Sequence, residues 1–532
     1  MIDKITNNLD TIPRLLTHRV AQTPHAIAFM EKQANAWKGI SWQQFYGKAT
    51  RLARKFVISG VKPGDGLAIL MANSIAWEIV QHAGFMAGCV VIGLDQKDPP
   101  ERLARTIHMA RIRVLAIQSP KMLEKIPPAL FTSLKLVLVG NGLKTIKRHG
   151  RMKGLSDPKA GPKRLPRIEK TQCATLLFTS GTTGAPKAIP YDHDQLAEAV
   201  KAISLQIQDL PDQAHSACWL PLSSPFQRMI NYCGLLMNHQ TFMVPDSATL
   251  MADVQEIAPH FMAAVPRFYE KIYETLSGQT IEHPIPGPRT LFGKNLRFFI
   301  SGSAPLSCSL LEKFHAGGWR ILESYGVSEN IVPMSMNTLT AYQLGTVGKP
   351  LPQNTVKIAR DGEVLVKGIG VARKGVCLTH DGYLKTGDAG AIDENGYLRL
   401  TGRKSDEFKL STGRRISPLV IESRLTRIRS VDHAVIEGAR HKYIVALLAI
   451  SLDAWQKLCR IHGSEKRLRH FIRQEIDRVT QNLPAHFRPV AFGVIHTPFS
   501  VETGELTQNF KVRRNHVLDA YRTQFNALHK GE

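Results

Sequence analysis

Apolar and polar residues follow a helical period near the start of the chain and a strand-like pattern soon after it. Ser41 is of a type that caps helix N-termini, and Gly60 is of a type that ends helices. Between them, six apolar residues share one helical face: Trp42, Phe45, Ala49, Leu52, Ala53 and Phe56. The run GLAILMA, which begins at Gly66, then predicts a buried strand. The pattern favours alternating helices and strands.

The same alternation continues through the middle of the chain. LRFFISGSAPL, from Leu296 to Leu306, predicts a strand that enters a Gly/Pro turn, and SLLEKFHAGG predicts a helix after it. No repeat of solenoid length is visible. We therefore expect an α/β fold, with a large multi-layer N-terminal domain in which helices flank β-sheets.

A second unit is expected beyond a dense, charged and glycine-containing connector, TGRKSDEFKLSTGRR, which begins at Thr401. Strand-like HAVIEGARHKYIVALLAIS and helical RLRHFIRQEIDRVTQNL follow it, and this part of the chain has about the length of one domain. We place the boundary at residues 403–406, with an N-terminal domain at 1–402 and a smaller α+β domain at 407–532.

The composition is typical of a globular protein. The chain has 532 residues, of which 43% are hydrophobic and 21% are charged, and this length corresponds to about three or four domain-sized units. No run reaches the roughly 18 apolar residues of a membrane-spanning helix, and the N-terminus lacks the features of a secretory signal. A cytoplasmic location is the expectation. The seven cysteines are scattered without a CxxC pair, so we expect reduced thiols.

The charge balance is unusual, because 69 Lys and Arg residues against 44 Asp and Glu residues give +25. Such an excess favours anionic partners. Residues 143–170 interleave basic residues with Gly and Pro, which indicates an exposed loop; peripheral contact with an anionic membrane surface is the functional alternative. No helix-turn-helix, zinc-finger or RNA-binding signature accompanies the charge, so no nucleic-acid partner is expected.

The segment LLFTSGTTGAPK, from Leu176 to Lys187, is the first candidate for chemistry. A strand over 175–178 leads into a loop whose glycines allow backbone N–H groups to converge on an anion. The loop differs from a Walker A sequence, since Pro186 precedes the lysine and Ala188 follows it. A polar surface turn and a cradle for a polyphosphate both remain open at this point. The candidate ligands are Thr179, Ser180, Gly181, Thr182, Thr183, Gly184 and Lys187.

FTSGTTGAPKAIPYDH resembles the phosphate-loop signature of the acyl-adenylate-forming superfamily, which includes acyl-CoA synthetases. LPLSSPFQRM, AAVPRFYEKIY and ELTQNFKVRR look most like long-chain acyl-CoA synthetases. The resemblance implies an enzyme that activates a carboxylic acid, here a medium- or long-chain fatty acid, with ATP and Mg²⁺ and passes the acyl group to coenzyme A. Other motifs similar to the family's occur in the family's order: GSAPL at Gly302, ESYGVSE at Glu323, YLKTGD at Tyr383, TGRKSDEFK at Thr401 and TGELTQNFKVRR at Thr503.

The resemblance also implies a nucleotide site. The glycine- and hydroxyl-rich loop is expected on the β- and γ-phosphates. Tyr325 is expected against one face of adenine and the turn Gly302-Ser303-Ala304 against the other. Asp388 has the carboxylate oxygens to accept both ribose hydroxyls, and Arg403 is expected near the ribose and phosphate. The remaining residues assigned to this site by resemblance are Glu323, Ser324, Gly326 and Ser328.

Two charged residues and a moving domain complete the implied mechanism. Glu329 is expected to hold Mg²⁺, a hard cation that prefers carboxylate oxygen. Lys511 is expected to be the catalytic lysine, which stabilises charge between the α-phosphate and the attacking carboxylate. The C-terminal domain is then expected to rotate about the hinge at 403–406, so that Lys511 leaves and another loop approaches the site. That loop contains Lys409, Gly413 and Arg414, with Arg414 and Arg415 as candidates for a coenzyme A phosphate.

Several positions depart from the family pattern. Ala188 replaces a usual glycine, Ser224 replaces the histidine usual in long-chain synthetases, and Ser405 occupies the hinge position in place of Asp or Lys. The span 371–383 is also shorter than usual. His193 has a match in the family, but a loop-capping role is equally open. The acceptor therefore stays open between coenzyme A and the phosphopantetheine of an acyl carrier protein, and the acid between a fatty acid and another carboxylate such as an aryl acid; a non-catalytic basic nucleic-acid-binding relative is the less favoured alternative.

Overall fold

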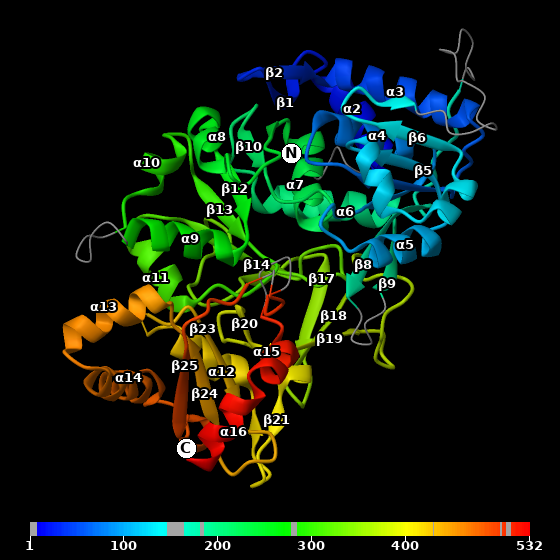
Figure 1. The fold of residues 1–532 in the computed structure, drawn as a ribbon. Coiled ribbons are helices and arrows are strands. Elements are labelled where there is room, and N and C mark those ends of the chain that lie inside the picture. Colours follow the sequence, from blue (N-terminus) through cyan, green and yellow to red (C-terminus); the bar gives the residue numbers. More distant parts are fainter. Residues whose placement is uncertain are drawn as a thin grey trace.

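The structure, a computed structural model, describes residues 8–145, 164–180, 186–277, 285–428, 430–500, 503–506 and 512–531. Two large sheets with their helices form about the first two-thirds of the chain, and smaller sheets follow below them in Figure 1. The expected α/β fold class is confirmed. Among the described residues, none of the helices combines the length and the apolar character needed to cross a bilayer.

The first large sheet has nine strands and is parallel through its centre. Its central strands run parallel from β14 to β1, and antiparallel strands close both edges. In spatial order the strands are β16 (Lys349–Pro350), β15 (Ser335–Met336), β14 (Ile321–Tyr325), β13 (Phe298–Ser301), β12 (Phe261–Ala264), β10 (His215–Cys218), β11 (Gln240–Met243), β1 (Ile27–Gln33) and β2 (Ala36–Ser41).

The second large sheet has seven strands and ends in a hairpin that carries the glycine- and hydroxyl-rich loop. In spatial order its strands are β7 (Lys144–Thr145), β6 (Leu136–Val139), β5 (Ile112–Ile117), β3 (Gly66–Leu70), β4 (Val90–Gly93), β8 (Cys173–Ser180) and β9 (Pro186–Asp192). β4 and β8 pair in parallel, whereas β8 and β9 pair antiparallel. The predicted strands at Gly66 and over 175–178 are confirmed.

The main hydrophobic core joins the two sheets through helices. Its members include buried residues of both sheets and of the helices between them. These helices are α2 (Ile12–Gln22), α3 (Trp42–Ile58), α4 (Ile75–Met86), α6 (His193–Gln206) and α7 (Pro225–Met237). A further core packs helices on the other side of the nine-stranded sheet, namely α8 (Leu250–Ile257), α9 (Pro266–Ser277), α10 (Pro288–Phe292) and α11 (Cys308–Ala316). Helix α5 (Pro100–Met109) and the 3₁₀ turns η1 (Pro120–Lys125) and η2 (Pro128–Ser133) cover the seven-stranded sheet.

Helix α3 shows why the hydrophobic pattern could be read. The Ser41 side chain accepts the backbone N–H of Gln44, and the Gln44 side chain accepts the N–H of Ser41, which satisfies two free donors at the start of the helix. Gly60, just past the last turn, has a φ of +80° that favours glycine. The six residues predicted to share one face are the buried residues of the helix.

A four-stranded antiparallel sheet lies between the two large sheets and the C-terminal part of the chain, as Figure 1 shows. Its strands are β17 (Asn354–Ile358), β18 (Glu363–Gly368), β19 (Leu384–Ile392) and β20 (Leu398–Arg403). Tyr325, at the end of β14, belongs to the small core of this sheet. The nine-stranded sheet and the four-stranded sheet therefore meet at Tyr325.

The chain after β20 builds its own cores from residues beyond Lys404. A short 3₁₀ turn, η3 (Lys404–Asp406), leads to the hairpin β21 (Phe408–Lys409) and β22 (Arg415–Ile416). A three-stranded sheet follows, made of β23 (His433–Glu437), β24 (Val445–Ala449) and β25 (Ala491–Ile495). Around it lie α12 (Pro418–Leu425), α13 (Leu452–His462), α14 (Glu465–Thr480), η4 (Ala485–Phe487), α15 (Arg514–Ala520) and α16 (Arg522–Lys530).

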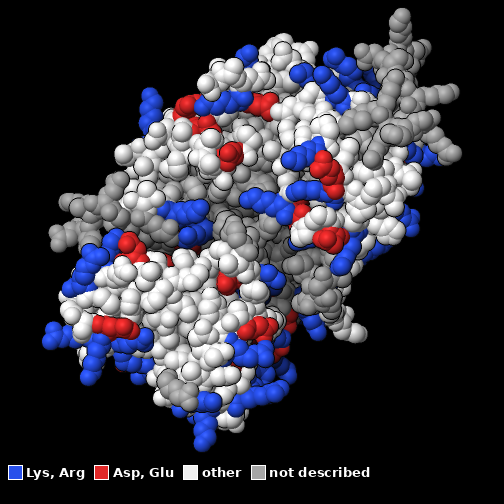
Figure 2. Space-filling model, viewed as in Figure 1, with Lys and Arg blue, Asp and Glu red and all other residues white. Residues whose placement is uncertain are grey.

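The surface carries the positive charge in many places. Figure 2 shows Lys and Arg side chains over both the upper and the lower parts of the visible face, with fewer Asp and Glu side chains between them. Most of the basic stretch 143–170 lies outside the described residues, so its predicted exposure and membrane contact stay predictions. All seven cysteines are free, as expected.

Candidate active site

Tyr325, Asp388 and Arg403 meet where β14, β19 and β20 come together. The Tyr325 hydroxyl donates to Oδ2 of Asp388 at 2.7 Å, and Nε of Arg403 lies 3.0 Å from Oδ1 of the same carboxylate. Asp388 is 6% exposed, whereas the Arg403 side chain is 57% exposed. Each carboxylate oxygen therefore has one fixed donor, and the guanidinium keeps a free face toward solvent.

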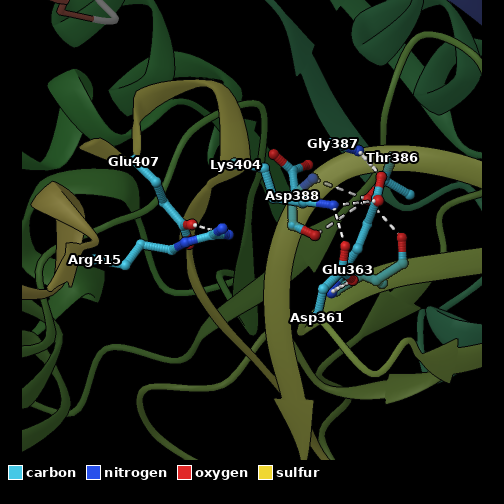
Figure 3. A network of polar contacts seen from close by, with 9 residues as sticks. Asp361, Glu363, Thr386, Gly387, Asp388, Lys404, Glu407 and Arg415 are labelled. Carbon is cyan, nitrogen blue, oxygen red and sulfur yellow. Dashed lines mark hydrogen bonds and ion pairs between the residues drawn. The ribbon is translucent and has the colours of Figure 1, made fainter. Parts of the chain in front are cut away.

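Asp388 stands on a bulge of β19. Glu363 pairs with Ala389 and Leu365 with Lys385, so the segment between them in β19 contains more residues than the facing segment of β18. The Thr386 hydroxyl donates to the carbonyl of Val364 at 2.7 Å and accepts the N–H of Asp388 at 3.1 Å. Figure 3 shows these contacts around Asp388. The bulge turns the Asp388 carboxylate toward Tyr325 and Arg403.

The turn after β13 lies beside the residue that precedes Tyr325. The Ser324 hydroxyl donates to the carbonyl of Ser301 at 3.2 Å, and a Cβ added at Gly302 would lie 3.0 Å from the same hydroxyl oxygen. Ser303 has a φ of +72°, in the left-handed region that non-glycine residues rarely adopt. The structure thus brings Gly302, the first residue of the turn Gly302-Ser303-Ala304, next to Ser324 of β14. The contact of this turn with adenine stays a prediction.

Glu323 is buried on the same strand. Its side chain lies near Leu306, whose N–H favours the ionised form, but burial is the larger effect and raises the pKa of the carboxyl to about 8. At neutral pH this group is therefore mostly the neutral acid and carries little negative charge. Sequence reasoning assigned Glu323 to the site without this distinction. Gly326, two residues past Ser324, is exposed.

Three chain segments converge at Glu329. The Tyr191 hydroxyl of β9 donates to the carbonyl of Ser328 at 2.6 Å, and the N–H of Ala372 donates to the carbonyl of Glu329 at 2.9 Å. The Glu329 side chain is half-buried, and within the described part of the chain its carboxylate has no hydrogen-bond or ion-pair partner. A fixed backbone with a free carboxylate oxygen suits Mg²⁺, which binds to few protein oxygens and retains water.

The glycine- and hydroxyl-rich loop is the turn of the β8–β9 hairpin. Thr179 pairs with Lys187 and Ser180 with Pro186 at the base of the hairpin. A strand therefore returns after the loop, where a Walker A loop would be followed by a helix. Lys187 is exposed at this base. Gly181, Thr182, Thr183 and Gly184, the side chains of Thr179 and Ser180, and the whole of Lys511 lie outside the described residues, so their roles stay predictions.

The β21–β22 hairpin contacts the C-terminal part of the chain. The N–H of Arg440 donates to the carbonyl of Lys409 at 3.1 Å, and Arg414 contacts Nδ1 of His486 at 2.9 Å. Gly413 has a φ of +81° in the turn. The described contacts of Lys409 and Arg414 are with the C-terminal part of the chain, and the approach of Lys409, Gly413 and Arg414 to the site stays a prediction. A shallow hollow of about 200 Å³ lies at the base of this hairpin, lined by Lys404, Glu407, Phe408, Lys409 and Arg415.

His193 is neither a cap nor an exposed ligand. The N-cap of α6 is Asp192, whose N–H donates to the Gln195 side chain at 3.2 Å, so the loop-capping interpretation was wrong. His193 is fully buried against Phe85, with ring centroids 5.4 Å apart, and neither ring nitrogen has a hydrogen-bond partner among the described residues. Burial lowers its pKa to about 4. It is a neutral packing residue at physiological pH.

A cluster of Glu437, His441 and His529 in the C-terminal part does not have the geometry of a metal site. Nε2 of His529 lies 2.5 Å from Oε2 of Glu437, which is a hydrogen bond. The two imidazole rings stack with centroids 3.6 Å apart and planes 11° apart, so their lone pairs cannot converge on one ion. In the part of the chain that the structure describes, Nδ1 of His529 is buried without the second partner that a metal-bound histidine usually has. The cluster ties α16 to the end of β23.

Buried histidines and a buried acid set the expected pH dependence of stability. Burial lowers the pKa of His193 to about 4, of His239 to about 3 and of His433 to about 4, and it raises that of Glu323 to about 8. Glu78 and His82, 3.8 Å apart, shift in opposite directions and nearly offset each other.

We predict maximal stability near pH 6.5. Below that pH the three histidines are protonated in the unfolded state but stay neutral in the folded state. Glu323 has the opposite effect, because above about pH 4.5 it is ionised in the unfolded state but still protonated in the folded state. The net difference near pH 5 is two protons, so the free energy of unfolding should fall by about 3 kcal/mol per pH unit on acidification. Above pH 6.5 the stability contributed by protonated Glu323 is lost as the pH rises toward 8.

Urea unfolding between pH 4.5 and 8.5 measures this dependence. His239→Leu should make the acid slope shallower by about 1.4 kcal/mol per pH unit, since it removes one of the three histidines. Replacement of exposed His108 by Gln is the matched control and should leave the slope unchanged. Equal slopes for wild type and His239→Leu would contradict the prediction.

The comparisons with known proteins agree with this geometry. The model of the AMP-binding enzyme family matches residues 16–376, and the model of the AMP-binding enzyme C-terminal domain matches residues 405–532. The chain belongs to the AMP-binding enzyme family. It is therefore an enzyme of the superfamily that the motifs from Thr179 to Thr503 resemble.

Relatives of this AMP-binding enzyme cover nearly the whole chain. The long-chain-fatty-acid–CoA ligase FadD15 of Mycobacterium bovis is 25% identical, with 98% of each chain covered. The anthranilate CoA ligase AuaEII, in complex with anthranoyl-AMP, has a TM-score of 0.78 at 18% identity and covers 96% of this chain and 97% of its own. The O-succinylbenzoate CoA synthetase MenE of Bacillus subtilis, in complex with ATP and magnesium, has a TM-score of 0.72 at 20% identity, with 94% and 98% covered. The two structures share the adenylate-forming fold with this chain.

Proposed function

We propose that this AMP-binding enzyme activates a fatty acid with ATP and transfers the acyl group to coenzyme A. In the first step a carboxylate oxygen attacks the α-phosphorus, the bond from that phosphorus to the bridging oxygen breaks, and pyrophosphate leaves with the electron pair. In the second step the thiolate of coenzyme A attacks the acyl carbon, and AMP leaves. Neither step needs an oxidant or a reductant.

The observation that carries the proposal is the Asp388 carboxylate, held between Tyr325 and Arg403. Its two oxygens have fixed donors at 2.7 and 3.0 Å and retain acceptor capacity for a pair of neighbouring hydroxyls such as those of a ribose. The exposed guanidinium of Arg403 lies beside it and is suited to a phosphate. An acceptor for a diol next to a donor for an anion is the arrangement that a nucleotide requires.

In this proposal the β8–β9 hairpin binds the polyphosphate of ATP. Backbone N–H groups of a glycine-rich turn bind anions well, and Lys187 at the base of the hairpin adds a point charge. Mg²⁺ would be held at Glu329, where it neutralises charge on the phosphates as pyrophosphate leaves. Lys511, expected on the C-terminal domain, would stabilise the charge that develops between the carboxylate and the α-phosphate.

The acid and the acceptor are the finer parts of the proposal. A fatty acid is favoured because the relative FadD15, which is named a long-chain-fatty-acid–CoA ligase, covers 98% of both chains. AuaEII and MenE act on aryl acids by their names, but their identities of 18% and 20% support the fold alone. Coenzyme A is favoured over an acyl carrier protein by the same relative.

Pyrophosphate release across a panel of carboxylic acids tests the proposal. The purified full-length chain, with ATP and Mg²⁺, is offered fatty acids from C6 to C18, benzoate, anthranilate and amino acids. We expect release with medium- or long-chain fatty acids, and consumption of the acyl-adenylate when coenzyme A is added. Release with aryl acids alone would overturn the fatty-acid assignment, and consumption by a holo carrier protein but not by coenzyme A would overturn the acceptor. No release with any acid would overturn the ligase activity itself.

A further inference from the structure

The bulge that presents Asp388 is held by a buried carboxylate to which the sequence motifs assign no role. Glu363, at the start of β18, is 7% exposed, and its Oε1 accepts the N–H of Gly387 at 2.9 Å. Gly387 has a φ of +72°, so its N–H is turned out of the normal strand ladder and needs an acceptor. The Glu363 carboxylate therefore holds the residue that directly precedes Asp388 in the chain.

The second oxygen of the same carboxylate holds the end of β20. Oε2 of Glu363 lies 2.8 Å from Nζ of Lys404, and Oδ2 of Asp361 lies 2.5 Å from the same nitrogen. Lys404 directly follows Arg403, whose Nε reaches Asp388. Figure 3 shows Glu363, Gly387, Asp388 and Lys404 close together. The Glu363 carboxylate thus links Gly387, which precedes Asp388, with Lys404, which follows Arg403.

The energetics favour a fixed arrangement. The side chains of Glu363 and Lys404 are 10% and 27% exposed, so their attraction is screened less than that of a surface pair. A buried carboxylate with a charged donor on one oxygen and a backbone N–H on the other is well satisfied. Removal of the carboxylate leaves both donors without this partner, and an unsatisfied buried group is the costlier state.

We propose that Glu363 is a positioning residue for nucleotide binding, which sets the distance between Asp388 and Arg403 by holding Gly387 and Lys404. This role rests on the proposed function, since it acts through the proposed ribose site.

A pair of substitutions separates positioning from simple stability. Glu363→Ala removes both contacts, whereas Glu363→Gln keeps an oxygen that can accept the Gly387 N–H and loses only the charge toward Lys404. We expect the KM for ATP to rise about tenfold in Glu363→Ala and to stay within about threefold of wild type in Glu363→Gln, with kcat changed by less than about threefold in both. Asp381→Ala is the matched control, because Asp381 pairs with Lys357 at the edge of the same sheet and the described hydrogen bonds of its carboxylate are with Lys357 and Thr379.

A second variant and a second measurement keep the test decisive if Glu363→Ala folds poorly. Lys404→Met removes the ammonium group that pairs with Glu363, on the more exposed residue of the pair. We expect the KM for ATP to rise about threefold. Stabilisation of the folded chain by ATP can be measured as a thermal shift without any carboxylic acid substrate. It should decrease most in the variants whose KM for ATP rises most, because it depends only on the affinity for ATP. Wild-type KM and thermal shift in Glu363→Ala would overturn the proposal, as would equal losses in Glu363→Ala and Asp381→Ala. Absence of turnover in the wild type would instead count against the proposed function.

Discussion

Replacement of Asp388 by alanine should lower kcat/KM for ATP by about 100- to 1,000-fold in the adenylation step. The buried carboxylate is proposed to accept two ribose hydroxyls, and a hydrogen bond to a charged group contributes about 1.5–3 kcal/mol. The substitution also leaves the Tyr325 hydroxyl, now 2.7 Å from Oδ2, without its buried acceptor. Pyrophosphate release as a function of ATP concentration measures the loss, which should lie mainly in KM because ribose binding is uniform along the reaction.

Tyr325→Phe is the matched control for this result. It removes only the hydroxyl that donates to Asp388 and keeps the aromatic ring proposed to lie against adenine. We expect a loss of at most about tenfold, since the aromatic ring and the Asp388 carboxylate, the two groups proposed to contact the nucleotide here, are both kept. If Tyr325→Phe lowered kcat/KM for ATP as much as Asp388→Ala does, the loss would be due to the packing of the site and not to the ribose contacts of Asp388. Unchanged KM for ATP in Asp388→Ala would remove the ribose role of this residue.

Local elements could be predicted where the chain's own spacing determines them. Helix α3 follows from Ser41, Gly60 and a single apolar face, and each is a local property of the sequence. The strand at β3 could be predicted for a similar reason, because a continuous apolar run between polar segments is typical of a strand buried on both faces. Asp388 and Arg403 could be proposed because the motifs that contain them resemble those of the family.

The contacts that join these residues could not be predicted from spacing. Tyr325 and Asp388 are 63 positions apart and belong to different sheets, so their contact depends on how the sheets pack. The role of Glu363 was missed, since nothing in the sequence around it indicates that its carboxylate holds a bulge in β19. The raised pKa of Glu323 was missed for the same reason, because the burial of a carboxyl group depends on the tertiary structure.

The largest effect on the chemical step is expected from Lys511→Ala. A cation between the α-phosphate and the attacking carboxylate stabilises charge that is present mainly in the transition state, so its loss should lower kcat more than it raises KM. Loss of comparable preorganised donors costs about 2.7–4 kcal/mol, which corresponds to about 100- to 1,000-fold in rate. Single-turnover pyrophosphate release measures this step directly.

The two half-reactions and a second lysine make this prediction specific. Transfer from synthetic acyl-AMP to coenzyme A should be nearly unchanged in Lys511→Ala, because the rotation expected about the hinge at 403–406 removes this residue from the site before the thiol attacks. Lys187→Ala, at the base of the β8–β9 hairpin, should raise the KM for ATP with a smaller effect on kcat, since Lys187 is proposed to bind phosphate in the ground state as well. Lys530→Ala, an exposed lysine of α16, should behave as wild type. If Lys187→Ala abolished adenylation while Lys511→Ala retained it, the decisive cation would belong to the hairpin, and the C-terminal domain would have no part in the first step.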